Sequence, residues 1–211
     1  MKNFFVLLTF LFGFCLSKTG FTLSKDDKNV AFLMNLQTLN SNFTQNTLNN
    51  KNEIETTKGK IVVKKPDSIA LDLDSKEMRI KLVSINGNVK IIDKDLNQTT
   101  YLDNQYSELL QFFTNNLKPE KLYYDKQKRF CMDFQNQGSN WKGCLNIDLN
   151  KNTIKNLSVF LIDKQIDKTG KTTIREYPAM DIVFNNPIIN GAVDNSEFYI
   201  KDNRIFDDEE D

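Results

Sequence analysis

Histidine is absent from this 211-residue sequence, and glycine is scarce. Without histidine the chain lacks the commonest general base and metal ligand, so an enzyme would depend on carboxylates, lysine, tyrosine or cysteine. The eight glycines form no phosphate-cradling loop, so no nucleotide site is predicted. We therefore expect no catalytic residues, no metal site and no cofactor.

A net charge is also lacking. Lys and Arg total 28, and Asp and Glu total 28. Such a balance produces no overall positive field to concentrate nucleic acid. We expect no nucleic-acid partner.

The N-terminus carries a short apolar run. Lys2 is basic, and residues 4–16 are almost entirely apolar before polar Ser17 and Lys18. A bilayer-spanning helix needs about 20 apolar residues, so this order is typical of an export signal peptide. We predict a signal peptide at residues 1–17, with cleavage as late as residue 24; a buried helix is the alternative.

The remaining length suits one domain. We predict a single domain over residues 25–206. The five acidic residues 207–211 repel one another and predict a solvated tail.

Hydrophobic periodicity divides this domain into helices and strands. Helical spacing follows Asp26 or Asp27 as far as Leu39, and period two begins at Phe43. A second helical pattern occupies Asp103–Asn115. Further strands are predicted at 59–64, 69–73, 78–85, 88–93, 121–134, 141–148, 154–162, 172–177 and 180–184.

This pattern predicts a mainly β (α+β) fold: an open, incomplete antiparallel β-barrel, or curved sheet, with a helical lid. A gap between lid and sheet could hold a ligand. The alternative is that the helices and side chains simply fill it.

Two cysteines flank a turn-like segment symmetrically. Antiparallel pairing around Asn136–Asn140 would place Cys131 opposite Cys144, and a disulfide there would contribute about 3 kcal/mol. A reactive thiol is the alternative, but no histidine or Cys-x-x-Cys motif accompanies it.

Paired acidic residues raise the possibility of glycoside hydrolysis, which uses two carboxyl groups. Asp72 and Asp74 alternate with apolar residues, and Asp93 and Asp95 lie in a turn region. Both patterns favour solvated surface carboxylates.

Five motifs occur in the order found in a known periplasmic family. They span nearly the whole exported chain, and their collinear order is more specific than any one of them. The motifs are Phe43-Thr44-Gln45, Gly59 to Lys65-Pro66, Val83-Ser84-Ile85-Asn86-Gly87, Ile91 to Thr99, and Asn190-Gly191-Ala192-Val193-Asp194 followed by Phe198. On these motifs the chain resembles LolA, the carrier of outer-membrane lipoproteins.

The resemblance implies a periplasmic chaperone that carries lipoproteins from the inner to the outer membrane. Its unclosed, lidded barrel would shelter their acyl chains, and each buried methylene is worth about 0.8 kcal/mol. The cavity and lid residues implied are Phe43, Val62, Ile69, Leu71, Leu73, Leu109, Phe112 and Phe113.

A basic residue before the proline, usually Arg, holds the lid shut in similar proteins until cargo displaces it. Lys65 occupies that place as a candidate latch. It departs from the family pattern because lysine cannot copy the planar fork of arginine.

The resemblance also implies partners. An inner-membrane ABC transporter of the LolCDE type would load the carrier, and a LolB-like acceptor or the outer membrane itself would receive the cargo. We expect a monomer. The alternative is a periplasmic regulatory module of the same fold that senses lipoproteins or lipids; an enzyme in the same cavity has no residue constellation in its favour.

Overall fold

The computed structural model describes residues 23–48, 53–75, 79–102, 108–115, 117–136, 138–166 and 172–200. The predicted signal peptide, residues 1–17, and the predicted tail, residues 207–211, lie outside this part of the chain. Within the described residues, no helix has the length and apolar character needed to cross a membrane.

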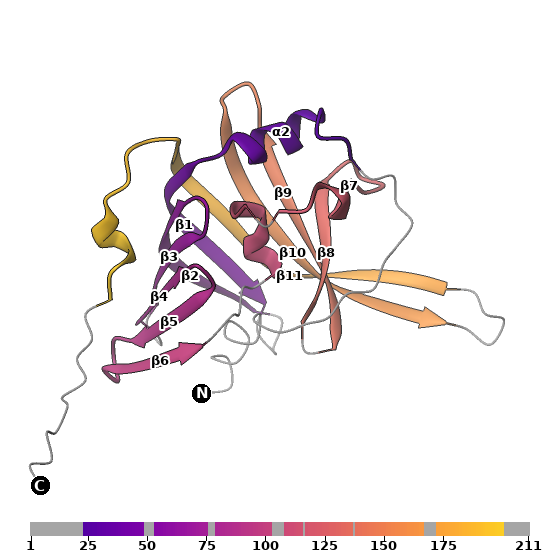
Figure 1. Ribbon diagram of the computed structural model, residues 1–211. Coiled ribbons are helices and arrows are strands. Elements are labelled where there is room, and N and C mark those ends of the chain that lie inside the picture. Colours follow the sequence, from indigo (N-terminus) through magenta and orange to yellow (C-terminus); the bar gives the residue numbers. More distant parts are fainter. Residues whose placement is uncertain are drawn as a thin grey trace, which may run out of the picture.

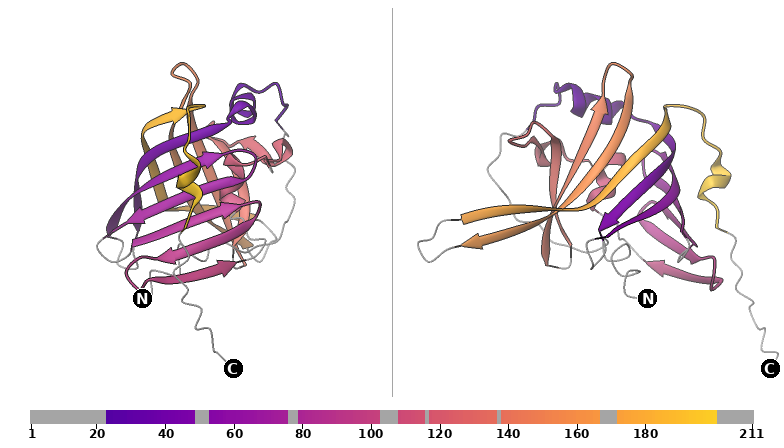
Figure 2. Two further views of the ribbon diagram at one scale, coloured as in Figure 1. Left: turned by 60° about the vertical axis from the view of Figure 1, so that its left-hand side comes forward. Right: turned by 180° about the vertical axis from the view of Figure 1, so that it is seen from behind.

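Strands dominate the structure (Figure 1). One 11-stranded sheet has the order β6-β5-β4-β3-β2-β1-β11-β10-β9-β8-β7, and the paired strands are antiparallel. The strands are β1 (Thr38–Leu48), β2 (Ile54–Lys64), β3 (Ser68–Asp74), β4 (Arg79–Ile85), β5 (Asn88–Asp93), β6 (Gln98–Leu102), β7 (Leu122–Tyr124), β8 (Phe130–Asn136), β9 (Ser139–Asp148), β10 (Thr153–Ile166) and β11 (Thr172–Ile189). β6 and β7 form opposite edges, so the sheet is open. The two further views show that it is curved (Figure 2). The predicted mainly β, open antiparallel fold is confirmed.

A two-residue turn connects one of these antiparallel strand pairs. Asn86 and Gly87 join β4 to β5, with φ angles of 50° and 87°. Two central residues at positive φ are the requirement of the tightest hairpin turns, and Asn-Gly meets it with little strain.

The first helix, α2 (Lys28–Asn35), begins at a side-chain cap. The Asp27 carboxylate accepts hydrogen bonds from the backbone N–H groups of Asn29 and Val30, at 2.9 and 3.2 Å. The helix ends earlier than the predicted Leu39, because the chain enters the sheet at Thr38: Asn190 Oδ1 accepts from Gln37 N and Thr38 N. Tertiary hydrogen bonds thus override the helical spacing.

The second predicted helix, over Asp103–Asn115, is a 3-10 helix, η2 (Glu108–Phe113), in the described residues. It lies in the concave space between the two halves of the curved sheet (Figure 1). Two shorter 3-10 helices follow: η3 (Pro119–Lys121) before β7 and η4 (Asn195–Phe198) after β11.

Two predicted strand boundaries were wrong. The strand predicted at 121–134 is interrupted because the Asp125 carboxylate accepts from Gln127 N and Arg129 N, both at 2.9 Å, which forms a turn between β7 and β8.

β11 continues where two separate strands were predicted. It passes through Pro178, which has no N–H group to donate. Next to it Ala179 is left out of the pairing with β10, which shifts between the pairs Val159–Met180 and Phe160–Pro178. Such an irregularity lets a proline remain within a sheet. No strand was predicted at β6.

The main core fills the concave face. It includes Val30, Leu33 and Leu36 from the α2 region, Phe112 and Phe113 from η2, and inward-facing residues of both halves of the sheet. A separate cluster lies on the outer face of β2–β4, where Phe198 and Ile200 cover Val62, Ala70 and Val83. The C-terminal segment crosses this outer face in Figure 2 (left, yellow).

Candidate functional site

The concave face of β2 and β3 forms an apolar wall. Ile69 and Leu73 are fully buried, and Leu71 is partly buried against the same core. They pair with Val63, Gly59 and Ile61 on β2, and partners in an antiparallel pair project to one face. The structure therefore brings these three predicted wall residues together.

Phe43 adds an aromatic ring to this wall from β1. It is 2% exposed and pairs with Gly59. A Cβ atom at Gly59 would lie 2.4 Å from Phe43 Cζ and 2.5 Å from the Asp72 carbonyl oxygen. Glycine is therefore required there for the ring and the neighbouring strand to approach so closely.

The lid residues of η2 point into the same core. Phe112 and Phe113 are 0% and 1% exposed. The Phe112 ring lies 6.5 Å from that of Phe130, and Phe113 lies edge-on to Phe184 at 6.3 Å. η2 therefore contacts β8 and β11. Leu109 lies in η2, but its side chain is outside the described part of the structure.

Val62 lies on the opposite face of the sheet from the other predicted wall residues. Ile61 and Val63 face the main core, so Val62, between them, faces outward. It packs beneath Phe198 and Ile200. The wall on the concave side therefore does not include Val62.

Lys65, the predicted latch residue, joins the sheet to α2. Its Nζ donates a hydrogen bond to the Leu33 carbonyl oxygen at 2.7 Å. This carbonyl belongs to the last turn of α2, where a cation interacts favourably with the helix dipole. Burial lowers the pKa of the Lys65 ammonium group, as expected for a cation moved out of water.

The backbone beside Lys65 holds the other end of the lid. Lys65 N donates to Gln37 O at 2.8 Å, and the Pro66 carbonyl accepts from Asn115 N at 3.1 Å. Asn115 follows η2 by two residues. The segment Lys65–Pro66 therefore contacts both lid elements, α2 and the chain after η2.

Three polar residues on the concave face were missed by the sequence analysis. Ser41, Gln45 and Ser84 are 2%, 7% and 1% exposed. Strand alternation in the sequence could have placed Ser84 on this face, because it follows Ile80 and Leu82 at every second residue. Alternation places the residue on a face, but it gives no sign that a serine there is buried.

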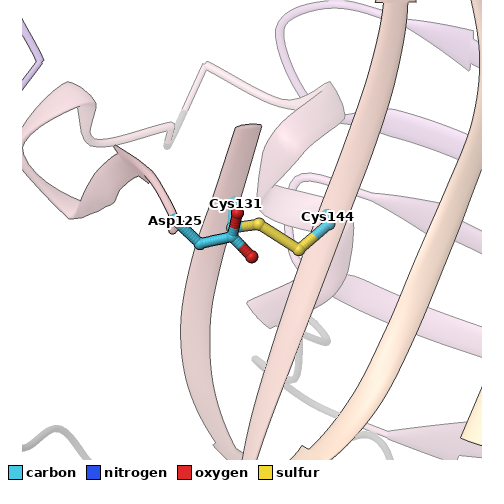
Figure 3. A group of neighbouring side chains, drawn as sticks. All are labelled: Asp125, Cys131 and Cys144. Atoms are coloured by element: carbon cyan, nitrogen blue, oxygen red, sulfur yellow. A yellow bond between two sulfur atoms is a disulfide. The ribbon is translucent and has the colours of Figure 1, made fainter. Parts of the chain in front are cut away.

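Cys131 and Cys144 form a disulfide between β8 and β9. The predicted pairing is confirmed. Figure 3 shows the Asp125 carboxylate beside the two sulfur atoms. Disulfide sulfurs are not the thiolate ligands that metals prefer, and this carboxylate already accepts from Arg129 Nε at 2.6 Å; the contacts are structural.

A charged cluster surrounds that carboxylate. Arg129 Nη2 also contacts Glu176 at 2.6 Å, and Lys142 Nζ donates to Glu176 and lies 3.7 Å from Asp125. Burial alone would raise the pKa of the Asp125 and Glu176 carboxyl groups, but hydrogen bonds from Arg129 to Asp125, and from Lys142 and Arg129 to Glu176, outweigh it and lower both. On the neighbouring strands, Tyr123 donates a hydrogen bond to Asp133. Burial is the larger cause, and this hydrogen bond the next, of the raised pKa of Tyr123.

The acidic pairs considered for glycoside hydrolysis have surface contacts. Asp72 forms an ion pair with Lys94 at 2.6 Å, and Asp95 forms one with Arg79 at 2.7 Å. Asp93 accepts from the backbone of the turn that follows it. These contacts stabilise the β3–β6 surface.

The sequence model described as outer membrane lipoprotein carrier protein LolA matches residues 34–201, which is more than half of the chain. No curated protein matches.

Two solved structures are similar at low identity. One is described as an outer membrane lipoprotein-sorting protein domain from Vibrio parahaemolyticus, with a TM-score of 0.43 and 6% identity over 81% of this chain and 93% of that one. The other is a LolA superfamily protein from Nitrosomonas europaea, with a TM-score of 0.39 and 6% identity over 79% of this chain and 95% of that one. The family model, matching most of the chain, shows that this protein belongs to the LolA family.

Proposed function

We propose that this protein is a periplasmic chaperone that binds the acyl chains of lipoproteins released from the inner membrane and carries them to the outer membrane. Residues 25–206 would be its single carrier domain after removal of a signal peptide. The observation that carries the proposal is the apolar concave face of an open sheet, covered by α2 and η2. Family membership supports the same activity.

The proposed binding step exchanges lid side chains for acyl chains. Exposing the buried Phe112 and Phe113 rings would cost about 3–6 kcal/mol in total, at about 1.5–3 kcal/mol each. An acyl chain of about a dozen methylenes would recover about 10 kcal/mol when buried. The exchange therefore favours cargo in the concave space.

Lys65 acts as the latch in this proposal. Its hydrogen bond to Leu33 O holds the C-terminal end of α2 to the sheet. Entry of cargo would move α2 and replace the stabilisation that this bond gives. Because lysine offers single-point contacts rather than a planar fork, the latch would restrain the lid at one carbonyl.

The partners follow from the same proposal. An ABC transporter of the LolCDE type would load the carrier, and a LolB-like acceptor or the outer membrane itself would receive the cargo. The cycle requires that the carrier hold the cargo less tightly than its acceptor does.

A release assay tests this function. The full chain would be expressed in bacteria and the exported protein purified, then mixed with inner-membrane vesicles that contain the cognate transporter and a triacylated lipoprotein. We expect ATP-dependent release of the lipoprotein into the supernatant as a one-to-one complex.

The control is a non-acylated lipoprotein variant, which should not be recovered in the complex. No release by folded protein with an active transporter would contradict the carrier function. Binding of the lipoprotein without transfer to outer membranes would favour a lipoprotein-sensing regulatory module.

A further inference from the structure

Ser84, on β4, places a hydroxyl group next to the apolar wall of β2 and β3. It pairs with Ile69 on β3 and Val89 on β5, so its side chain projects to the concave face. The residue is 1% exposed, and its Oγ has no hydrogen-bond partner within the described residues. A buried hydroxyl without a partner is costly, so a group that accepts a hydrogen bond from it would be favoured there.

The surroundings of Ser84 are apolar on both sides. Ile69 belongs to the main core. Val89 belongs to a smaller cluster with Ile80 and Ile91, against which Leu82 packs. An alkyl chain lying along this part of the face would therefore pass a hydrophobic surface that contains the Ser84 hydroxyl group.

The position of Ser84 also suits the polar part of a lipid. Its partner Ile69 follows Pro66 by three residues, and the Pro66 carbonyl holds Asn115 of the lid. This is the end of the wall where lid and sheet join. When an amphiphile inserts its chains into an apolar space, its ester groups remain near such a rim.

We propose that Ser84 Oγ donates a hydrogen bond to an ester carbonyl oxygen of the diacylglyceryl group of the cargo. The inference rests on the proposed carrier function and adds a polar contact to it. Ser84 thereby distinguishes ester-linked acyl chains from other alkyl chains of the same length.

Ser41 provides a matched control on the same face. It is also buried, but its Oγ donates to Asn42 O at 2.6 Å and lies 3.3 Å from Asn185 O. Its hydroxyl is therefore already used within the sheet. Removal of this group should not discriminate between ligands.

The test compares two probes with the purified exported protein. One is a synthetic tripalmitoylated lipopeptide whose glyceryl chains are esters, and the other is its dialkyl-ether analogue, which lacks those two carbonyls. Binding is followed by the fluorescence of Trp141, the single tryptophan, which packs against the main core. Urea midpoints confirm that each variant is folded.

Ser84→Ala should weaken binding of the ester probe about fivefold, the effect of one neutral hydrogen bond, and change binding of the ether probe less than twofold. Ser84→Thr keeps the hydroxyl and should keep the preference for ester. Ser41→Ala should affect both probes alike. Equal effects of Ser84→Ala on the two probes, with normal binding by the wild-type protein, would overturn only the role of Ser84, whereas wild-type protein that binds neither probe would overturn the carrier function as well.

Discussion

Polar side chains on the two faces of the curved sheet differ in how they are paired. On the outer face of β8, β9 and β11, Asp125, Arg129, Lys142 and Glu176 form a connected network beside a disulfide. On the concave face, Ser84 has no hydrogen-bond partner in the described structure, and α2 is tied to β2 through Lys65.

The difference indicates which parts of the molecule stay together. Breaking the outer network would leave buried charges unpaired, which costs several kcal/mol. In the proposed carrier cycle, opening the lid would break the Lys65–Leu33 hydrogen bond and expose the Phe112 and Phe113 rings, whose contacts the cargo would replace. The outer network therefore suits a permanent scaffold, and the concave face suits an exchange of contacts.

The largest expected effect comes from removing one member of the outer network. Asp125→Ala removes the buried ion pair with Arg129 and the acceptor of the Gln127 and Arg129 backbone N–H groups, and leaves Glu176 as the only carboxylate of the network. We therefore expect the free energy of unfolding to fall by about 4 kcal/mol. Urea denaturation measures it. Asp72→Ala, which breaks the exposed pair with Lys94, is the control and should cost no more than about 1 kcal/mol; equal losses would remove the contrast between network and surface.

Removing the disulfide comes next. The double variant Cys131→Ala with Cys144→Ala removes a crosslink between residues with a sequence separation of 13. We expect the free energy of unfolding to fall by about 3 kcal/mol. Urea denaturation of wild-type protein under reducing conditions should show a similar loss. An unchanged midpoint in both experiments would mean that strand pairing and the ion network hold β8 to β9 without help from the disulfide.

The lid contact should have a smaller and more local effect. Lys65→Met keeps the apolar stem and removes the donor to Leu33 O, so the free energy of opening α2 should fall by about 2 kcal/mol. Hydrogen exchange of the α2 amides measures this opening. Lys64→Met removes an exposed contact with Asn195 and is the matched control; faster exchange in both variants alike would argue against a specific latch.

Acid should give the smallest effect, and the outer network should contribute a distinct part of it. The folded-state pKa values of Asp125 and Glu176 lie below their ordinary values of 3.8 and 4.5. Their stabilisation is therefore complete above the ordinary values and is lost as the pH falls toward and through the lowered ones. Glu176 is 30% exposed, which weakens its share by solvent screening.

Unfolding midpoints measured in urea from pH 7 down to about pH 3 test this. The wild-type midpoint should decline, and Asp125→Ala should decline less steeply because one of the two titrating groups is gone. Parallel curves for the two proteins would show that the acid sensitivity arises elsewhere.

Much of this organisation could be predicted from local patterns. Period two placed Ile69, Leu71 and Leu73 on one face, because alternation depends only on the strand itself. The symmetric spacing of Cys131 and Cys144 around a turn fixed their register in the same way. Antiparallel neighbours in sequence leave little freedom for pairing.

Other features depended on distant residues and could not be read locally. Three consecutive apolar residues, Ile61, Val62 and Val63, indicate that both faces are covered, but the cover over Val62 comes from Phe198 and Ile200. The continuation of β11 through Pro178 depends on a shift in its pairing with β10, at Ala179. The burial of Ser84 likewise depends on the assembly of the whole concave face.

The free edges at β6 and β7 give this sheet a mechanical property that a sealed cylinder lacks. A closed barrel has a diameter fixed by its strand number and shear, and widening it means breaking or shifting interstrand hydrogen bonds. A sheet whose end strands do not meet can flatten or tighten by small changes of twist spread over its ten strand pairs. The same hydrogen-bonded sheet can therefore enclose contents of different volume, because its curvature can change while its strand pairs stay intact.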